Sequence, residues 1–136
     1  MSAAGAGPRF EAAMYGTVMR GQPHHHRIDG AELLRESRTA PRYRLLAVGG
    51  EYPLLVEATG AATGGSIAVQ VFSLDAPTWR GKVDREPEGL LEGEAELEDG
   101  STVAIMLGDP AWLAGRDDVE DITSYGGWAA FAAART

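Results

Sequence analysis

Cysteine is absent from the 136 residues of the chain. Without cysteine there can be no disulfide framework, no thiolate zinc site, no iron–sulfur cluster and no cysteine nucleophile. A chain of this length buries about two-thirds of its unfolded surface on folding, so it needs no covalent cross-links for stability. The lack of disulfides fits a reducing compartment, and we expect a cytoplasmic protein.

Basic residues and long apolar runs are also scarce. The chain has 12 Lys and Arg residues against 20 Asp and Glu residues, and its formal net charge is -8. Phosphate backbones and anionic membrane surfaces repel such a protein, so we expect neither nucleic acid nor a membrane as partner. No apolar run approaches the roughly 20 residues of a membrane span. No basic segment precedes an apolar run at the start of the chain, which predicts a protein that is not exported.

The chain shows no internal repeat and no long linker, which predicts one domain over residues 10–136 after a flexible tail over residues 1–9. Asp99 and Gly100 stand between two apolar runs and indicate a hairpin. Pro53 marks its own strand as irregular or as a sheet edge. We expect strands over residues 10–15, 43–48, 52–56, 67–71, 90–97 and 102–107.

Fewer helices are expected, and all of them are short. Asp29 followed by Glu32 has the spacing of a capping box and predicts a helix over residues 30–38. Asp75 is a candidate cap for a brief helix, because a proline follows two residues later. Several antiparallel strands with few helices predict an α+β fold with a small, mixed antiparallel β-barrel and short flanking helices. The last expected segments are a turn or helix at 110–113, an acidic loop at 117–121 and a terminal helix at 128–134.

The segment from Tyr125 to Trp128 carries two glycines and two aromatic residues. The glycines permit a turn with positive φ. Trp128 together with Phe131 can seal the last helix onto the sheet. We therefore interpret this segment as structural.

Residues 15–23 form the first candidate site. A glycine where a strand passes into a loop lets backbone N–H groups line a cradle for an anion or a carbonyl oxygen, and Thr17 adds a hydroxyl donor. A plain turn explains the same spacing equally well. The residues alone leave both interpretations open.

All the histidines of the chain stand together as His24, His25 and His26. On an extended segment the first and third point the same way and can share a metal ion. The remaining ligands of a known metal motif are missing, so we expect ordinary loop histidines, no metal and no other cofactor.

The acidic residues are concentrated between Asp84 and Asp99, where eight acids and one base give a local net charge of -7. The four glutamates at positions 92–98 alternate along an expected strand, and their side chains should face water. Glu86 and Glu88 lie in the loop before it. Burial of a loop carboxyl against a pocket raises its pKa toward the range useful for a general base, although a solvated carboxylate is the more common outcome.

Residues 14–26, which read Met-Tyr-Gly-Thr-Val-Met-Arg-Gly-Gln-Pro-His-His-His, resemble the opening signature of the gamma-glutamylcyclotransferase-like superfamily. Residues 39–45, 52–53 and 65–74 resemble the strands that follow it. Residues 121–128, Asp-Ile-Thr-Ser-Tyr-Gly-Gly-Trp, are similar to the carboxyl-terminal domain of allophanate hydrolases. That domain follows an amidase domain in longer chains, and here we expect it as a standalone protein.

The resemblance implies a small mixed barrel whose cavity loop is formed by Tyr15, Gly16, Thr17, Val18 and Met19. It also implies a glutamate that acts as general acid or base, normally within an Asp-x-x-Glu-Gly pattern. The corresponding segment here, residues 84–89, is one residue longer. Two glutamates remain as candidates, and the glycine after the second slightly favours Glu88 over Glu86.

Two reactions are implied, one by each branch of the superfamily. In the cyclotransferase branch the α-amine of the substrate attacks its own γ-glutamyl carbonyl and releases 5-oxoproline. The allophanate branch removes CO2 from an N-carboxylated carbamate, and it carries a histidine near the position of Val18. Both imply a small amide, carbamate or γ-glutamyl compound as partner.

The alternative is a non-catalytic module that binds a small acid or docks beside a separate amidase. Departure from the catalytic pattern of both branches favours it. We also expect a homodimer if the 67–71 face or the terminal helix is exposed.

Overall fold

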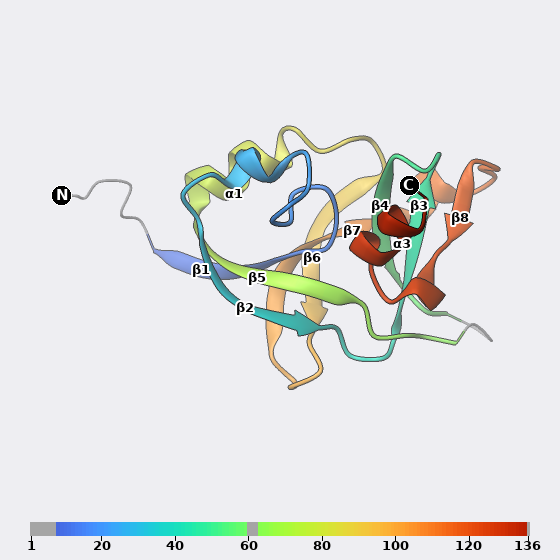
Figure 1. Ribbon diagram of the computed structural model, residues 1–136, viewed down its shortest axis with the longest axis horizontal. Helices are drawn as coiled ribbons and strands as arrows, with labels where there is room; N and C mark the ends of the chain where they lie inside the picture. The colour runs from blue at the N-terminus through green and yellow to red at the C-terminus, as the bar shows by residue number, and fades with distance from the viewer. Residues whose placement is uncertain (1–7, 60–62, 136) are drawn as a thin grey trace.

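Eight strands make the framework of residues 8–59 and 63–135, the part of the chain that the computed structural model describes (Figure 1). Residues 1–7, most of the expected tail, lie outside the described residues, as do residues 60–62 and 136. The strands are β1 (Arg9–Met14), β2 (Glu32–Arg38), β3 (Tyr43–Val48), β4 (Tyr52–Glu57), β5 (Ala68–Asp75), β6 (Leu90–Glu96), β7 (Thr102–Gly108) and β8 (Val119–Asp121).

The helices among the described residues are short. The predicted helix after Asp75 is confirmed, because the Asp75 carboxylate accepts a hydrogen bond from the backbone N–H of Thr78 at 2.9 Å and caps the helix. The expected helices at 110–113 and 128–134 are confirmed as well. The elements are α1 (Ala76–Val83), α2 (Pro110–Leu113), α3 (Trp128–Ala134) and the 3-10 helices η1 (His25–Ile28) and η2 (Thr123–Tyr125).

The strands form two sheets, a five-stranded one in the order β2-β5-β1-β7-β6 and a three-stranded one in the order β4-β3-β8. β1 runs antiparallel to β5 and parallel to β7, so the larger sheet is mixed. The edge strands of this sheet meet where Thr39 bridges Leu97. The mixed α+β class is confirmed. A single bridge is not a ladder, and a closed barrel stays a prediction.

The strands expected from alternation and turn signals are found with shifts of at most one residue at their ends, except that β5 continues four residues beyond the expected end at 71. β6 and β7 form the predicted hairpin, with Gly100 at φ 88° in the turn. β4, which contains Pro53, is an edge strand as expected, because a proline cannot donate to a second neighbour.

The helix predicted over residues 30–38 is wrong, because this segment is strand β2. Gly30 has φ 85°, and after it the chain continues extended, opposite β5 from Glu32 beside Ser73 to Arg38 beside Ala68. The capping-box signal is local, and the hydrogen bonds offered by the edge of β5 override it. The acidic loop expected at 117–121 likewise contains a short strand, β8, paired with β3.

The last helix closes the core as predicted. Trp128 and Phe131 are 5% and 3% exposed, and their ring centroids lie 5.4 Å apart. Gly126 has φ 81°, which confirms the expected positive-φ turn before the helix. Ile67, Val69 and Val71 are buried inside the protomer, so this face offers no surface to a second copy.

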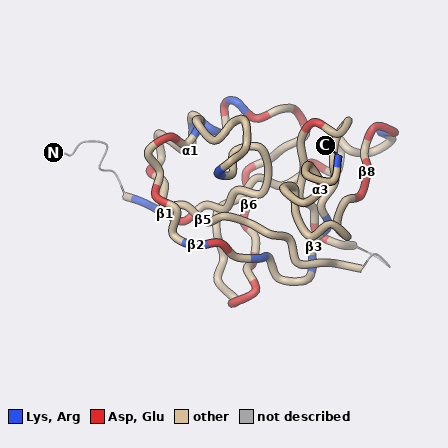
Figure 2. Tube along the Cα trace, in the orientation of Figure 1, with Lys and Arg blue, Asp and Glu red and all other residues tan. Residues whose placement is uncertain are grey.

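Many charged residues lie on the outside of the two sheets, whereas Lys82 is buried. Figure 2 shows acidic residues at the tip of the β6–β7 hairpin and around β8. Of the four glutamates at 92–98, three are exposed and Glu96 is half-buried, so the expected water-facing side of β6 is largely confirmed. No helix in the described part of the chain is long and apolar enough to cross a membrane.

Candidate functional site

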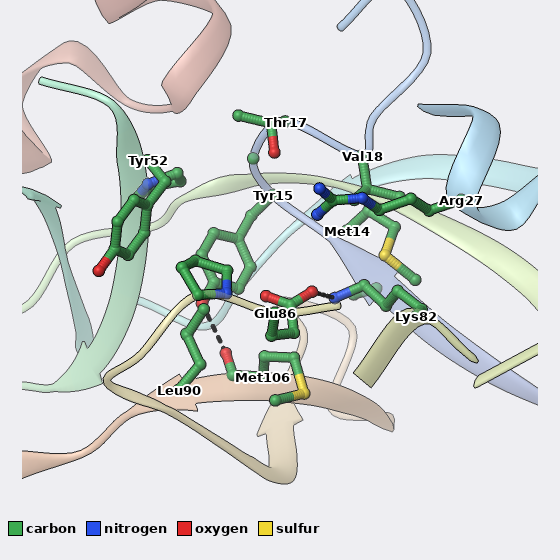
Figure 3. Close-up of a pocket in the computed structure, with 14 residues that line it drawn as sticks. Met14, Tyr15, Thr17, Val18, Arg27, Tyr52, Lys82, Glu86, Leu90 and Met106 are labelled. Atoms are coloured by element: carbon green, nitrogen blue, oxygen red, sulfur yellow. Dashed lines mark hydrogen bonds and ion pairs between the residues drawn. The ribbon is translucent and has the colours of Figure 1, made fainter. Parts of the chain in front are cut away.

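A small cavity lies where β1 runs into the loop at 15–18 (Figure 3). Its volume is about 40 Å³. Five segments distant in sequence form its walls: the end of β1 with its loop, η1, the start of β4, the end of α1 with the loop after it, and the facing ends of β6 and β7. The polar and charged side chains that line it are those of Tyr15, Thr17, Arg27, Tyr52, Lys82 and Glu86.

Tyr15 fixes the start of the cavity loop. Its buried hydroxyl donates to the carbonyl oxygen of Met106 at 2.6 Å and accepts from the backbone N–H of Leu55 at 3.1 Å. Burial raises the pKa of Tyr15 above its ordinary value, so the phenol stays protonated at physiological pH. One side chain thus joins the end of β1 to both β7 and β4, and its hydroxyl is already occupied.

Gly16 is required by close packing rather than by a positive φ. A Cβ at this position would stand 2.7 Å from Cγ of Pro53 in β4, closer than real contacts allow. The loop can therefore lie flat against β4. Within the described residues, the backbone N–H groups of Gly16, Thr17 and Val18 donate no hydrogen bond to the protein. Three consecutive N–H groups without protein acceptors are available to hold an anion or a carbonyl oxygen.

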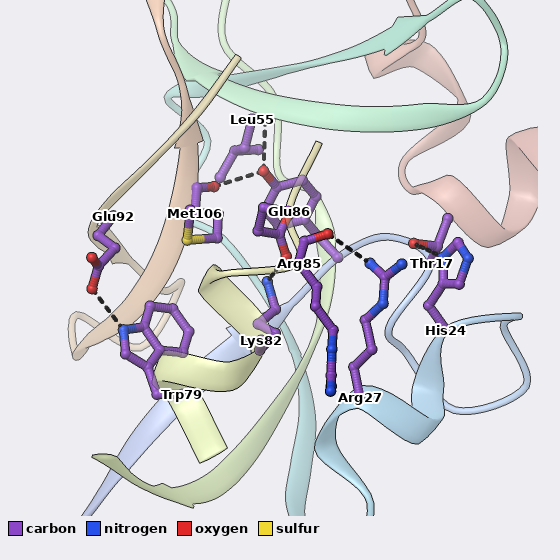
Figure 4. A network of polar contacts seen from close by, with 11 residues as sticks. Thr17, His24, Arg27, Leu55, Trp79, Lys82, Arg85, Glu86, Glu92 and Met106 are labelled. Atoms are coloured by element: carbon purple, nitrogen blue, oxygen red, sulfur yellow. Dashed lines mark hydrogen bonds and ion pairs between the residues drawn. The ribbon is translucent and has the colours of Figure 1, made fainter. Parts of the chain in front are cut away.

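Glu86 and Lys82 form a buried ion pair on the cavity wall (Figure 4). Lys82 Nζ lies 2.5 Å from Glu86 Oε1, and the two side chains are 7% and 11% exposed. Burial lowers the pKa of Lys82, and the positive charge of Arg27 acts in the same direction, whereas Glu86 opposes both. A carboxylate is thus held in place beside an ammonium group on the cavity wall.

Arg27, at the end of η1, brings a second positive charge to the cavity. Figure 3 shows its guanidinium pointing into the same space as the Glu86 carboxylate. It donates to the carbonyl oxygen of Arg85 at 3.3 Å, and no carboxylate among the described residues forms an ion pair with it. An arginine without a carboxylate partner at a cavity is suited to bind a carboxylate of a ligand.

The histidines support the loop from outside the cavity. Nδ1 of His24 lies 3.0 Å from the Thr17 hydroxyl, and Nδ1 of His25 donates to the Val18 carbonyl oxygen at 2.9 Å. Burial, together with the charges of Arg27 and His26, lowers the pKa of His24. Among the described residues, no group of three or more potential ligands is placed to hold a metal ion.

The sequence-predicted site residues separate into two groups. Tyr15, Gly16, Thr17, Val18 and Glu86 line the cavity, whereas Met19 and Glu88 do not. Glu88 is exposed, and its carboxylate lies 3.4 Å from Nε1 of Trp112. Of the two candidate glutamates, only Glu86 therefore lines the cavity.

Sequence reasoning missed Arg27 and Lys82. The spacing of Lys82 four residues before Glu86 was a usable signal, because residues four apart on a helical turn can pair. Lys82 is also the only lysine of the chain. No sequence signal placed Arg27 at the cavity, because η1 and the loop after α1 meet only in the folded chain.

These features define a small α+β domain with a cavity suited to a compact anionic molecule. The chain belongs to the family described as "Allophanate hydrolase C-terminal domain", which matches residues 10–133. The expected resemblance is thereby confirmed.

The relatives include both long and short chains. The urea amidolyase of Lachancea kluyveri is 28% identical over 121 residues, which are 85% of this chain and 7% of that protein. The solved structure of c4763, a protein specific to uropathogenic E. coli, has a TM-score of 0.84 at 26% identity and covers 93% of this chain and 98% of its own. The allophanate hydrolase of Kluyveromyces lactis has a TM-score of 0.85 at 24% identity over 95% of this chain and 22% of that one.

A solved gamma-glutamyl cyclotransferase has a TM-score of 0.55 at 12% identity over 84% of this chain and 70% of its own. At this identity the likeness concerns the fold alone. It confirms the expected gamma-glutamylcyclotransferase-like architecture.

Proposed function

We propose that the chain binds a small carboxylate-bearing amide or carbamate in this cavity, and that Glu86 carries a proton to the nitrogen of the bound molecule. One observation carries the proposal: donors that no protein carboxylate engages share one small space with a fixed carboxylate. The donors are the N–H groups of residues 16–18 and the guanidinium of Arg27. The carboxylate is that of Glu86, held by Lys82.

The size of the cavity favours a compact substrate. A single water needs about 10–15 Å³ of such space, so a volume of about 40 Å³ favours a compact ligand over an extended one. N-carboxylated carbamate, the substrate implied by the allophanate branch, suits this space better than a γ-glutamyl peptide. We therefore propose that the reaction is decarboxylation of an N-carboxylated carbamate and not cyclotransfer.

In this reaction the bond between nitrogen and one carboxyl carbon breaks, CO2 leaves, and the electron pair left on nitrogen takes a proton. Arg27 and the loop N–H groups would hold the carboxylate that remains. Fixed donors around an anion stabilise it without the reorganisation that water requires. Glu86, in the loop after α1, would deliver the proton.

The test generates the substrate in place, with an amidase domain that hydrolyses allophanate. We expect the wild-type chain to accelerate CO2 release, Glu86→Gln to lower kcat by about 100-fold or more, and Glu88→Gln to leave it unchanged. Malonate has a CH2 group where the substrate has NH. It should bind the wild type and lose affinity in Arg27→Met.

The other outcomes identify the other functions. A wild-type chain that binds malonate without accelerating CO2 release is a binding module. Release of 5-oxoproline from γ-glutamyl compounds identifies a cyclotransferase. If neither malonate nor γ-glutamyl compounds bind, the proposed site is wrong.

We also propose that the chain associates with an amidase. The observation in favour is that this chain spans 7% of the urea amidolyase it matches and 22% of the allophanate hydrolase structure. Co-purification with an amidase encoded beside it, at a fixed stoichiometry, would support this association, and elution of the two proteins apart would count against it.

A further inference from the structure

Lys82 is the only lysine of the chain, and the other 11 of its 12 basic residues are arginines. The two residue types differ in proton chemistry, because a guanidinium keeps its proton at any physiological pH whereas a buried ammonium can release one. The single residue of this set that can give up a proton therefore lies on the cavity wall.

The surroundings of Lys82 hold its amine in one position. Lys82 lies in the last turn of α1, where its Nζ is 5.6 Å from the centroid of the Trp79 ring. Trp79 is anchored by a hydrogen bond from its Nε1 to Glu92 at 2.8 Å. The charged and titratable groups that share the cavity with Lys82 are Glu86 from the loop after α1, Arg27 from η1, and Tyr15 and Tyr52 from the β1 and β4 sides.

We propose that Lys82 supplies the proton that Glu86 passes to the substrate nitrogen. This inference rests on the proposed function. The Lys82 ammonium gives one proton to Oε1 of Glu86, and the carboxyl group passes it to nitrogen as the C–N bond breaks. The ammonium and N-carboxylated carbamate become the neutral amine, carbamate and CO2, and the amine then regains a proton from water. Because Lys82 acts through Glu86, it is a positioning residue.

The presence of a single lysine allows a direct measurement. In protein labelled with ¹³C and ¹⁵N lysine, the one set of side-chain signals belongs to Lys82, and its titration can be followed by NMR. We expect Lys82 to titrate below the ordinary range of lysine, about pH 10.4. The protonated form is the active one, so kcat should fall as the pH rises through the same midpoint. A Lys82 midpoint in the ordinary range, or a kcat midpoint elsewhere, overturns the inference without any variant.

Two variants distinguish the ability of residue 82 to donate a proton from the positive charge that it places beside Glu86. Lys82→Arg keeps a cation beside Glu86 and cannot donate, so kcat should fall by about 100-fold or more while malonate affinity stays within about threefold. Arg80→Lys is the control, because it changes an exposed residue of the same helix and should leave kcat unchanged. The signal of the lysine introduced at position 80 should titrate in the ordinary range of lysine, and it serves as an internal reference for the Lys82 signal.

The two possible failures are distinguishable. If the wild type does not accelerate CO2 release, the proposed function fails. If the wild type is active and Lys82→Arg retains kcat within about threefold, only the role of Lys82 fails. If Lys82→Arg loses malonate binding as well, Lys82 is a ligand-binding residue and the proton-supply role is rejected.

Discussion

Single side chains decide the shape of the cavity. Glu86 and Glu88 are two positions apart in one loop and have opposite placements, since one is buried against Lys82 and the other is exposed beside Trp112. The glycine after Glu88, which favoured it in the sequence, is explained by packing. Gly89 has φ 96°, and a Cβ there would stand 2.4 Å from the Trp112 ring.

The Tyr15 hydroxyl tests how one buried polar group supports the site. Tyr15→Phe removes the partner of both the Leu55 N–H and the Met106 carbonyl, so unfolding should become easier by about 1–3 kcal/mol. Urea denaturation measures this change. Tyr52→Phe is the control, because the Tyr52 hydroxyl donates to the Glu88 carbonyl at an exposed position and its loss should cost less than about 1 kcal/mol. Equal losses in the two variants would contradict this account of Tyr15.

At the scale of elements, the last helix covers the core and depends on its packing there for stability. α3 has seven residues, too few for a stable isolated helix, and it is held by its two buried aromatic side chains. Tyr125 adds an edge-on contact with Phe131 at 5.3 Å from a more exposed position.

Trp128→Ala should therefore lower the free energy of unfolding by about 3–5 kcal/mol, because it leaves a cavity beside Phe131 in the core. Tyr125→Ala, which removes a side chain that is 44% exposed, is the matched control and should cost much less. Thermal and urea denaturation measure both. An unchanged melting temperature in Trp128→Ala would show that α3 does not seal the core.

The segment at 30–38 shows the limit of local signals at this scale. Asp29 and Glu32 have the spacing of a helix start, and the strand that forms instead is held by partners 30 to 41 residues away in β5. Hairpins and helix caps were predictable because their partners are close in sequence, as in Asp75 with Thr78. β2 and β8 were not, because each depends on a distant strand.

At the scale of the whole molecule, the acidic residues affect the stability of the fold through the hydrogen bonds that their carboxylates accept. Hydrogen bonds to three aspartates lower the pKa of each carboxyl group. The donors are Thr78 for Asp75, Ser101 for Asp99 and Arg116 for Asp118. A carboxyl whose pKa is lower in the folded state stabilises the fold at any pH above its pKa in the unfolded state. This contribution is lost as the pH falls through the pKa of the folded state.

We therefore expect the melting temperature to decline as the pH falls below about 4, the ordinary range of Asp. Calorimetry at constant ionic strength between pH 7 and pH 2 measures this decline. Asp75→Asn keeps a capping side chain without a titrating group, so its decline should be shallower. A melting temperature that rises below pH 4 would contradict the assignment.

By itself the sequence determined the α+β class, the hairpin, the cap of α1, the terminal helix and the loop at 15–18. These features depend on periodicity, turns and caps, whose interacting residues are neighbours in the chain. Only the tertiary structure decided that residues 32–38 form a strand, that Glu86 rather than Glu88 lines the cavity, and that Arg27 and Lys82 meet there. Those outcomes require segments thirty or more residues apart to share one space, and hydrogen bonding and burial between such segments leave no local pattern.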